Sequence, residues 1–88
     1  MQFSLEIVNE KGLHARASAK FVEVVERFDA RALVSRDGME VSGDSIMGLL
    51  MLGAGRGTSI DVTVEGAQAE ALAEALCSLV SGRFGEAT

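Results

Sequence analysis

The sequence predicts an α+β fold, an open-faced β-sandwich in which three helices cover one face of a four-stranded antiparallel sheet. Some short segments alternate apolar and polar residues, which is typical of half-buried strands. Other segments repeat apolar residues at helical spacing, and the two kinds follow one another in the order β-α-β-β-α-β-α. Strands with one apolar face need helices on that face. The 88 residues are expected to form a single domain, residues 1–88.

The first half of the chain alternates between strand and helix patterns. Residues 3–7 carry apolar side chains at every second position, which predicts a strand. Gly12 breaks that pattern, and from residue 15 to about residue 28 the apolar side chains recur at helical spacing, which predicts an amphipathic helix. Strands are predicted over residues 31–36 and 39–42, joined by an Asp-Gly pair that tolerates the positive φ angles of a tight hairpin.

The second half predicts a short helix, a strand and a long helix. Ser45 is placed to cap an apolar helix over residues 46–52. The glycine-rich residues 53–57 are more typical of a helix end and turn than of a phosphate or RNA loop, since no second cation or aromatic residue accompanies them. Strict alternation predicts a strand over residues 60–64, and helical spacing predicts a final amphipathic helix over residues 69–82.

Two features near the end of the chain carry little functional signal. The tail, residues 83–88, is expected to fray. Cys77 lies within the final helix and is expected to be inert and partly buried. As the single cysteine it cannot form an internal disulfide or a thiolate cluster, and no metal site is expected.

Composition and charge exclude several classes of function. Eight basic against 13 acidic residues give a net charge of −5, the wrong sign for a protein that binds duplex nucleic acid. The first residues lack the pattern of a signal peptide, and no apolar run approaches the length of roughly 20 residues that a bilayer requires. We expect a cytoplasmic monomer that does not insert into membranes.

The single histidine, His14, stands where a glycine turn leads into the first helix. A helix start presents backbone N–H groups without acceptors and a partial positive charge, which attract anions and disfavour a charged imidazole. The backbone amides of Ala15 and Arg16 and the Arg16 guanidinium could therefore stabilise a phosphoryl group. The arrangement favours a neutral, accessible imidazole that accepts and releases a phosphoryl group as a transient phosphohistidine. A histidine that only caps the helix is the simpler alternative.

The chain lacks the residues that several other common catalytic and binding sites require. One histidine cannot form a proton relay or a two-histidine metal site, and no Ser-His-carboxylate arrangement is evident. No Walker-type glycine loop is present, and no cofactor is expected. A small hydrolase of the acylphosphatase kind remains an alternative, with Asn9, the only asparagine, as the amide that positions water. A non-covalent regulatory binding module is another.

Two segments of the chain have distinctive sequences: Gly-Leu-His-Ala-Arg at residues 12–16 and Asp-Ser-Ile-Met-Gly-Leu-Leu-Met-Leu-Gly at residues 44–53. They resemble the two motifs of the HPr family, the histidine phosphocarriers of the bacterial phosphoenolpyruvate-dependent phosphotransferase system. The resemblance extends over nearly the whole chain in the same order of elements. It implies that His14 accepts a phosphoryl group on Nδ1, that Arg16 contacts this group, that enzyme I donates it and that an enzyme IIA-type protein receives it. Such a protein is a carrier rather than an independent turnover enzyme.

The resemblance has one departure and several further implications. The sugar-transport branch usually has proline after the arginine, whereas this chain has Ala17, and the segment looks more like the nitrogen-related NPr branch. Ser45 matches the regulatory serine that an HPr kinase/phosphorylase modifies, although a helix cap alone also explains a serine there. The short helix carries more apolar residues than a core requires, so we expect an exposed docking surface. Its predicted residues are Ile46, Met47 and Leu50, with Arg56 adding charge.

Overall fold

The computed structural model describes all 88 residues and confirms the predicted order of elements. The predicted strands over residues 31–36 and 39–42 have the observed bounds, and the other predicted boundaries differ from the observed ones by at most two residues. In chain order the elements are β1 (Gln2–Glu6), α1 (Ala15–Glu26), β2 (Arg31–Arg36), β3 (Met39–Ser42), α2 (Ile46–Met51), β4 (Ser59–Glu65), α3 (Ala69–Ser81) and a short 3₁₀ helix, η1 (Arg83–Gly85).

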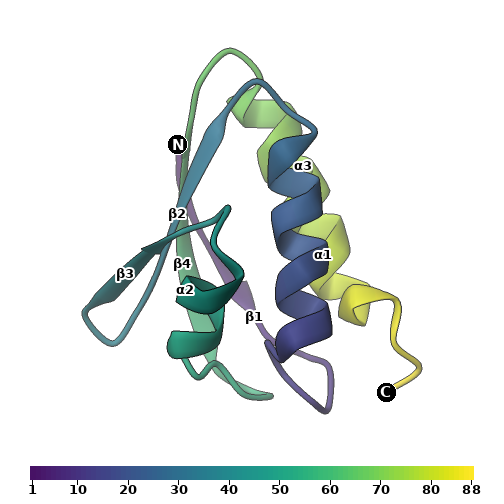
Figure 1. The fold of residues 1–88 in the computed structure, drawn as a ribbon. Helices are drawn as coiled ribbons and strands as arrows, with labels where there is room; N and C mark the ends of the chain where they lie inside the picture. The colour runs from purple at the N-terminus through teal and green to yellow at the C-terminus, as the bar shows by residue number, and fades with distance from the viewer.

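The four strands form one antiparallel sheet in the order β1-β4-β2-β3, and the helices lie on one side of it (Figure 1). The central strand β4 shows most clearly why the helices cover only one face of the sheet. Ile60, Val62 and Val64 are fully buried beneath the helices, while Asp61 and Glu65, between and after them, are exposed on the open face. The alternation in the sequence therefore directs one apolar face toward the helices.

Helices α1 and α3 lie side by side across the sheet (Figure 1) and are in direct contact. Each contributes fully buried side chains to the core, including Phe21 from α1 and Leu72 and Leu76 from α3, and α2 adds Leu49. The helical spacing of apolar residues is thus explained by a single core between the helix layer and the sheet. No helix is long and apolar enough to cross a bilayer.

The turn chemistry agrees with the sequence. Asp37 and Gly38 adopt φ angles of 50° and 83° in the hairpin between β2 and β3, the positive values that this tight turn requires. Ser45 caps α2, its Oγ accepting a hydrogen bond of 3.0 Å from the amide of Gly48. Gly53 ends the helix with a φ of 61°, which supports the interpretation of residues 53–57 as a helix end and turn.

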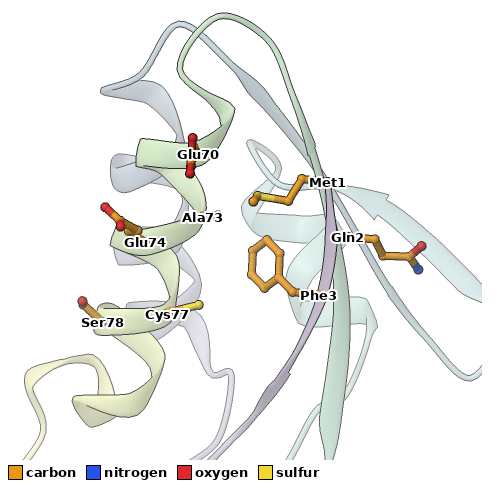
Figure 2. Close-up of a pocket in the computed structure, with 8 residues that line it drawn as sticks. All are labelled: Met1, Gln2, Phe3, Glu70, Ala73, Glu74, Cys77 and Ser78. Atoms are coloured by element: carbon orange, nitrogen blue, oxygen red, sulfur yellow. The ribbon is translucent and has the colours of Figure 1, made fainter.

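A groove of about 670 Å³ lies between the edge strand β1 and helix α3 (Figure 2). Phe3 and Cys77 point into it, and Glu70 and Glu74 lie along the helix beside it. The prediction of a partly buried Cys77 is wrong, because its side chain is exposed. At this position α3 faces the open groove instead of packing closely against the sheet.

Candidate functional site

The candidate site is built on a glycine turn. Gly12 has a φ of +68°, and a Cβ there would lie 2.6 Å from the carbonyl oxygen of Ala54. Glycine alone has both the left-handed conformation and the space for this close approach. The next residue, Leu13, is buried and donates its amide to the same Ala54 oxygen at 2.9 Å. The turn thereby fixes where the following residue, His14, enters the helix.

His14 is the N-cap residue of α1, with extended backbone angles of φ −79° and ψ −177°. The first hydrogen bond of the helix runs 2.8 Å from the amide of Ser18 to the carbonyl oxygen of His14. The amides of Ala15, Arg16 and Ala17 precede it and have no acceptor within the helix, so they form the positive end of the helix dipole. The imidazole does not cap these amides through its side chain, so they stay available to an anion.

Arg16 is exposed on the first turn of α1 and forms no ion pair with an acidic side chain. Its guanidinium is therefore free to approach an anion at the helix start. Ala17, at the place of the proline common in the sugar-transport branch, is fully buried inside the first turn. As expected, alanine forms the helix without difficulty there, and it keeps an N–H that proline would lack.

The surroundings of His14 differ from the sequence-based expectation in one respect. The sequence predicts an accessible imidazole near backbone amides and the Arg16 guanidinium, and in the structure its Nε2 also pairs with Oε2 of Glu86. The histidine side chain keeps 27% of its exposure and the glutamate 17%. Asn9, which is fully buried, donates from Nδ2 to the other carboxylate oxygen at 3.0 Å and to the carbonyl oxygen of Gly12 at 2.8 Å. The site therefore contains a linked Asn9–Glu86–His14 group.

This group depends on a tail that does not fray, so that prediction is wrong. Phe84 is 1% exposed and seats the tail in the core. Lys20 donates from Nζ to the carbonyl oxygen of Phe84 at 2.6 Å, and the amide of Glu10 donates to the carbonyl oxygen of Thr88 at 3.1 Å. Figure 1 shows the tail descending beside the end of the molecule where α1 begins. We call the docked residues 83–88 the strap.

The docked strap contains two non-glycine residues in a strained backbone conformation. Arg83 and Phe84 have φ angles of 58° and 54°, a left-handed conformation that costs roughly 1 kcal/mol for each non-glycine residue. Burial of the Phe84 ring offsets this cost, since a fully buried aromatic side chain contributes about 2 to 3 kcal/mol. An aromatic residue between two nearby glycines, Gly82 and Gly85, was the sequence signal that could have predicted docking.

The carboxyl group of Glu86 has a pKa lowered from its ordinary value of 4.5, first because His14 and then because Asn9 donate hydrogen bonds to the carboxylate, with Lys11 adding a weaker attraction. A lowered pKa stabilises the docked strap above pH 4.5, and this contribution is lost as the pH falls through the lower value. We therefore expect NMR signals of the strap to shift toward those of a released tail in acid. A Glu86→Gln variant should show no such transition, and an identical transition in the variant would contradict the assignment.

Helix α2 presents the exposed apolar side chains that the sequence predicts. Ile46, Met47 and Leu50 are 41%, 70% and 36% exposed, while Leu49 is fully buried. Met51 of the same helix, which is not among the predicted docking residues, is 64% exposed. We call Ile46, Met47, Leu50 and Met51 the α2 surface. Helices α1 and α2 are in contact, so the α2 surface lies on the same layer as the helix that His14 begins.

The remaining predicted residues form no hydrogen bond or ion pair with the imidazole, whose side-chain partner is Glu86. Arg56 is exposed in the turn after α2. Ser45 is half-buried at the start of α2, where its hydroxyl caps the helix. The structure contains no group of three or more His, Cys, Asp or Glu side chains that could hold a metal ion.

Comparison with known proteins agrees with this geometry. A family model described as "PTS HPr component phosphorylation site" matches residues 1–82. The phosphocarrier protein HPr of Neisseria meningitidis serogroup A is 45% identical over 83 residues, 94% of this chain and 93% of that protein. The phosphocarrier protein NPr of Shewanella violacea is 36% identical over 88 residues, 100% of this chain and 97% of that protein. The crystal structure of HPr-C-His from Thermoanaerobacter tengcongensis has a TM-score of 0.94 at 35% identity, covering 100% of this chain and 99% of that one.

An open-faced α+β sandwich with a histidine at the start of its first helix defines the class of histidine-containing phosphocarriers. The family match covers most of the chain, and the relatives are matched over nearly their whole length. The chain belongs to the HPr family and is a phosphocarrier of the phosphotransferase system.

Proposed function

We propose that His14 accepts a phosphoryl group on Nδ1 from enzyme I and passes it to an enzyme IIA-type protein in the cytoplasm. The observation that carries the proposal is the partly exposed imidazole at the N-terminus of α1, directly before three amides without helical acceptors. An imidazole nitrogen can form a bond to phosphorus and later surrender it, and the helix start attracts the phosphoryl oxygens.

Arg16 and the first backbone amides of α1 make different contributions to binding the phosphoryl group. The backbone N–H groups of Ala15 and Arg16 have fixed directions, so they offer oriented donors at no reorganisation cost. The exposed guanidinium of Arg16 can swing toward the phosphoryl group and neutralise part of its charge. The backbone N–H groups and the guanidinium only donate hydrogen bonds to the phosphoryl oxygens and transfer no proton. They can therefore stabilise the phosphoryl group both when it arrives at His14 and when it leaves.

The α2 surface is proposed as the docking surface for both partners, with Arg56 at its edge. Four apolar side chains are exposed on one short helix, and apolar side chains gathered in this way mark surfaces that bind partners. Two of them are methionines, whose flexible side chains adapt to different partner shapes. A carrier that binds donor and acceptor in turn with one face benefits from such adaptability, and we propose that it acts as a monomer.

Ser45 is proposed as a regulatory phosphorylation site for an HPr kinase/phosphorylase where the host has one. A phosphate adds about −1.5 to −2 charges. At the N-cap of α2 this charge is compatible with the fold, but it stands next to Ile46 of the docking surface. Modification should therefore weaken docking without unfolding the protein.

The substitution Ser45→Asp tests this expectation. We expect its affinity for enzyme I to fall on the order of tenfold, because an added negative charge beside an apolar interface is costly to desolvate. Titration calorimetry measures the change, and Ser81→Asp, which adds the same charge at the exposed end of α3, controls for net charge. Equal affinities of wild type and Ser45→Asp would remove the regulatory proposal.

Two alternatives make different predictions. An acylphosphatase-like hydrolase needs an amide that positions water beside an arginine, but the Nδ2 group of Asn9 is buried and bonded to Gly12 and Glu86. A non-covalent binding module needs no chemistry at His14 at all.

The distinguishing experiment uses protein labelled with ³²P by enzyme I and phosphoenolpyruvate. We expect the label to leave the carrier only when an enzyme IIA-type protein is added, and to appear on that protein. Continuous release of inorganic phosphate from acetyl phosphate without an acceptor would support the hydrolase instead. Full partner function of a protein that never becomes labelled would support the binding module.

A further inference from the structure

The two ring nitrogens of His14 have different surroundings. Nε2 pairs with the carboxylate of Glu86. Nδ1 makes no hydrogen bond in the protein, because the imidazole does not cap the helix. The fold thus distinguishes the two nitrogens, and the one left free is the one that the proposed function uses.

The carboxylate determines where the imidazole proton resides. Glu86 is ionised at neutral pH, since its pKa lies below the ordinary value. An ionised carboxylate only accepts hydrogen bonds, so the partner nitrogen, Nε2, must donate. In a neutral imidazole the proton is then on Nε2, and Nδ1 keeps its lone pair.

Glu86 is held in place by the fold rather than by its pairing with His14 alone. The Nδ2 group of Asn9 donates one hydrogen bond to the Glu86 carboxylate and another to the carbonyl oxygen of Gly12. Asn9 is fully buried and so cannot easily turn away. On the other side, Phe84 and its bond from Lys20 fix the strap two residues before Glu86. The strap lies beyond residues 1–82, the part matched by the family model.

We propose that Glu86, oriented by Asn9, is a positioning residue that keeps the His14 proton on Nε2 and so leaves the Nδ1 lone pair free to attack phosphorus. This inference rests on the proposed phosphoryl transfer at His14. As the N–P bond forms, the donor's bond to phosphorus breaks and its electron pair stays on the donor. The ring becomes a phosphoimidazolium whose Nε2–H still pairs with Glu86, and no proton has to move. Transfer to the acceptor returns the electron pair to Nδ1.

The carboxylate also favours the charged product of the first step. The positive charge that develops on the ring is shared with Nε2–H, directly beside the negative Glu86. A charged hydrogen bond of this kind is stronger than a neutral one. A carboxylate that orients an imidazole and stabilises its imidazolium form has the same two roles in serine hydrolases.

The direct test is the tautomer of His14, read by long-range ¹H–¹⁵N NMR correlations of ¹⁵N-histidine-labelled protein at mildly alkaline pH. Wild type should carry the proton almost entirely on Nε2. In Glu86→Ala a measurable fraction should move to Nδ1. Glu74→Ala, which removes an exposed carboxylate of α3 that lines the groove beside β1, should match wild type. Equal tautomer ratios in all three proteins would overturn the proposal, whatever their transfer rates.

A second measurement, the rate of labelling by enzyme I and phosphoenolpyruvate, tests the role in transfer. The rate should fall on the order of tenfold in Glu86→Ala, and Glu86→Gln, which can still accept from Nε2–H but carries no charge, should fall between the two. A shifted tautomer with an unchanged labelling rate would refute a role in transfer. If no variant is labelled, wild type included, the proposed function fails, while the tautomer ratios still decide whether Glu86 positions the proton.

Discussion

Protein with His14→Ala will take up no phosphoryl group from enzyme I and phosphoenolpyruvate. The chain has one histidine, so the substitution removes the only imidazole that can form the N–P bond. The amides at the start of α1 and the Arg16 guanidinium remain and can still bind an anion, but they offer no nucleophile. Labelling with ³²P, followed by gel electrophoresis under alkaline conditions, measures the loss.

The fold of this variant should persist, which makes the result interpretable. His14 does not cap α1 through its side chain, so the helix keeps its backbone hydrogen bonds, and the circular dichroism spectrum should match that of wild type. Arg27→Ala, at the exposed far end of the same helix, serves as the control and should be labelled normally. A folded His14→Ala protein that still becomes labelled would contradict the assignment of the acceptor.

The second large effect is expected from Phe84→Ala, which should lower the free energy of unfolding by about 3 kcal/mol. The Phe84 ring is 1% exposed, and its removal leaves a cavity between the strap and the core. Burial of the ring no longer offsets the left-handed backbone at Arg83 and residue 84, and only the polar contacts of the strap remain, so it should undock. Urea denaturation followed by circular dichroism measures the change in stability.

A half-buried aromatic residue provides the matched control. Phe28 follows α1 and packs at the edge of the core, so Phe28→Ala should cost less than Phe84→Ala. Undocking of the strap should also separate Glu86 from His14, and the His14 tautomer of Phe84→Ala should then resemble that of Glu86→Ala. A Phe84→Ala protein as stable as wild type would mean that the strap does not dock in solution.

The elements of the fold could be predicted because their signals are local. Alternation at residues 60–64 and helical spacing at residues 69–82 each reflect one buried face. The hairpin turn and the Ser45 cap are chemical signals confined to a few neighbouring residues. His14 and three of the four residues of the α2 surface were singled out in the same way, since a glycine turn before a helix and an excess of apolar residues both appear in the sequence.

The strap could not be predicted by such local reasoning. The contact between Asn9 and Glu86 joins residues 77 positions apart, and no periodicity encodes it. Docking also depends on a left-handed backbone at Arg83 and Phe84, a conformation that non-glycine residues rarely adopt. The carboxylate beside His14 therefore appeared only once the chain was folded.

The central claim, that His14 carries the phosphoryl group, is tested most directly by locating the modification in the intact protein. Wild type is incubated with enzyme I and phosphoenolpyruvate, kept alkaline, and analysed by intact mass and fragmentation. We predict a single phosphoryl group on His14 that mild acid removes. A phosphoryl group on Ser45 or any other residue, with His14 unmodified, would contradict the account.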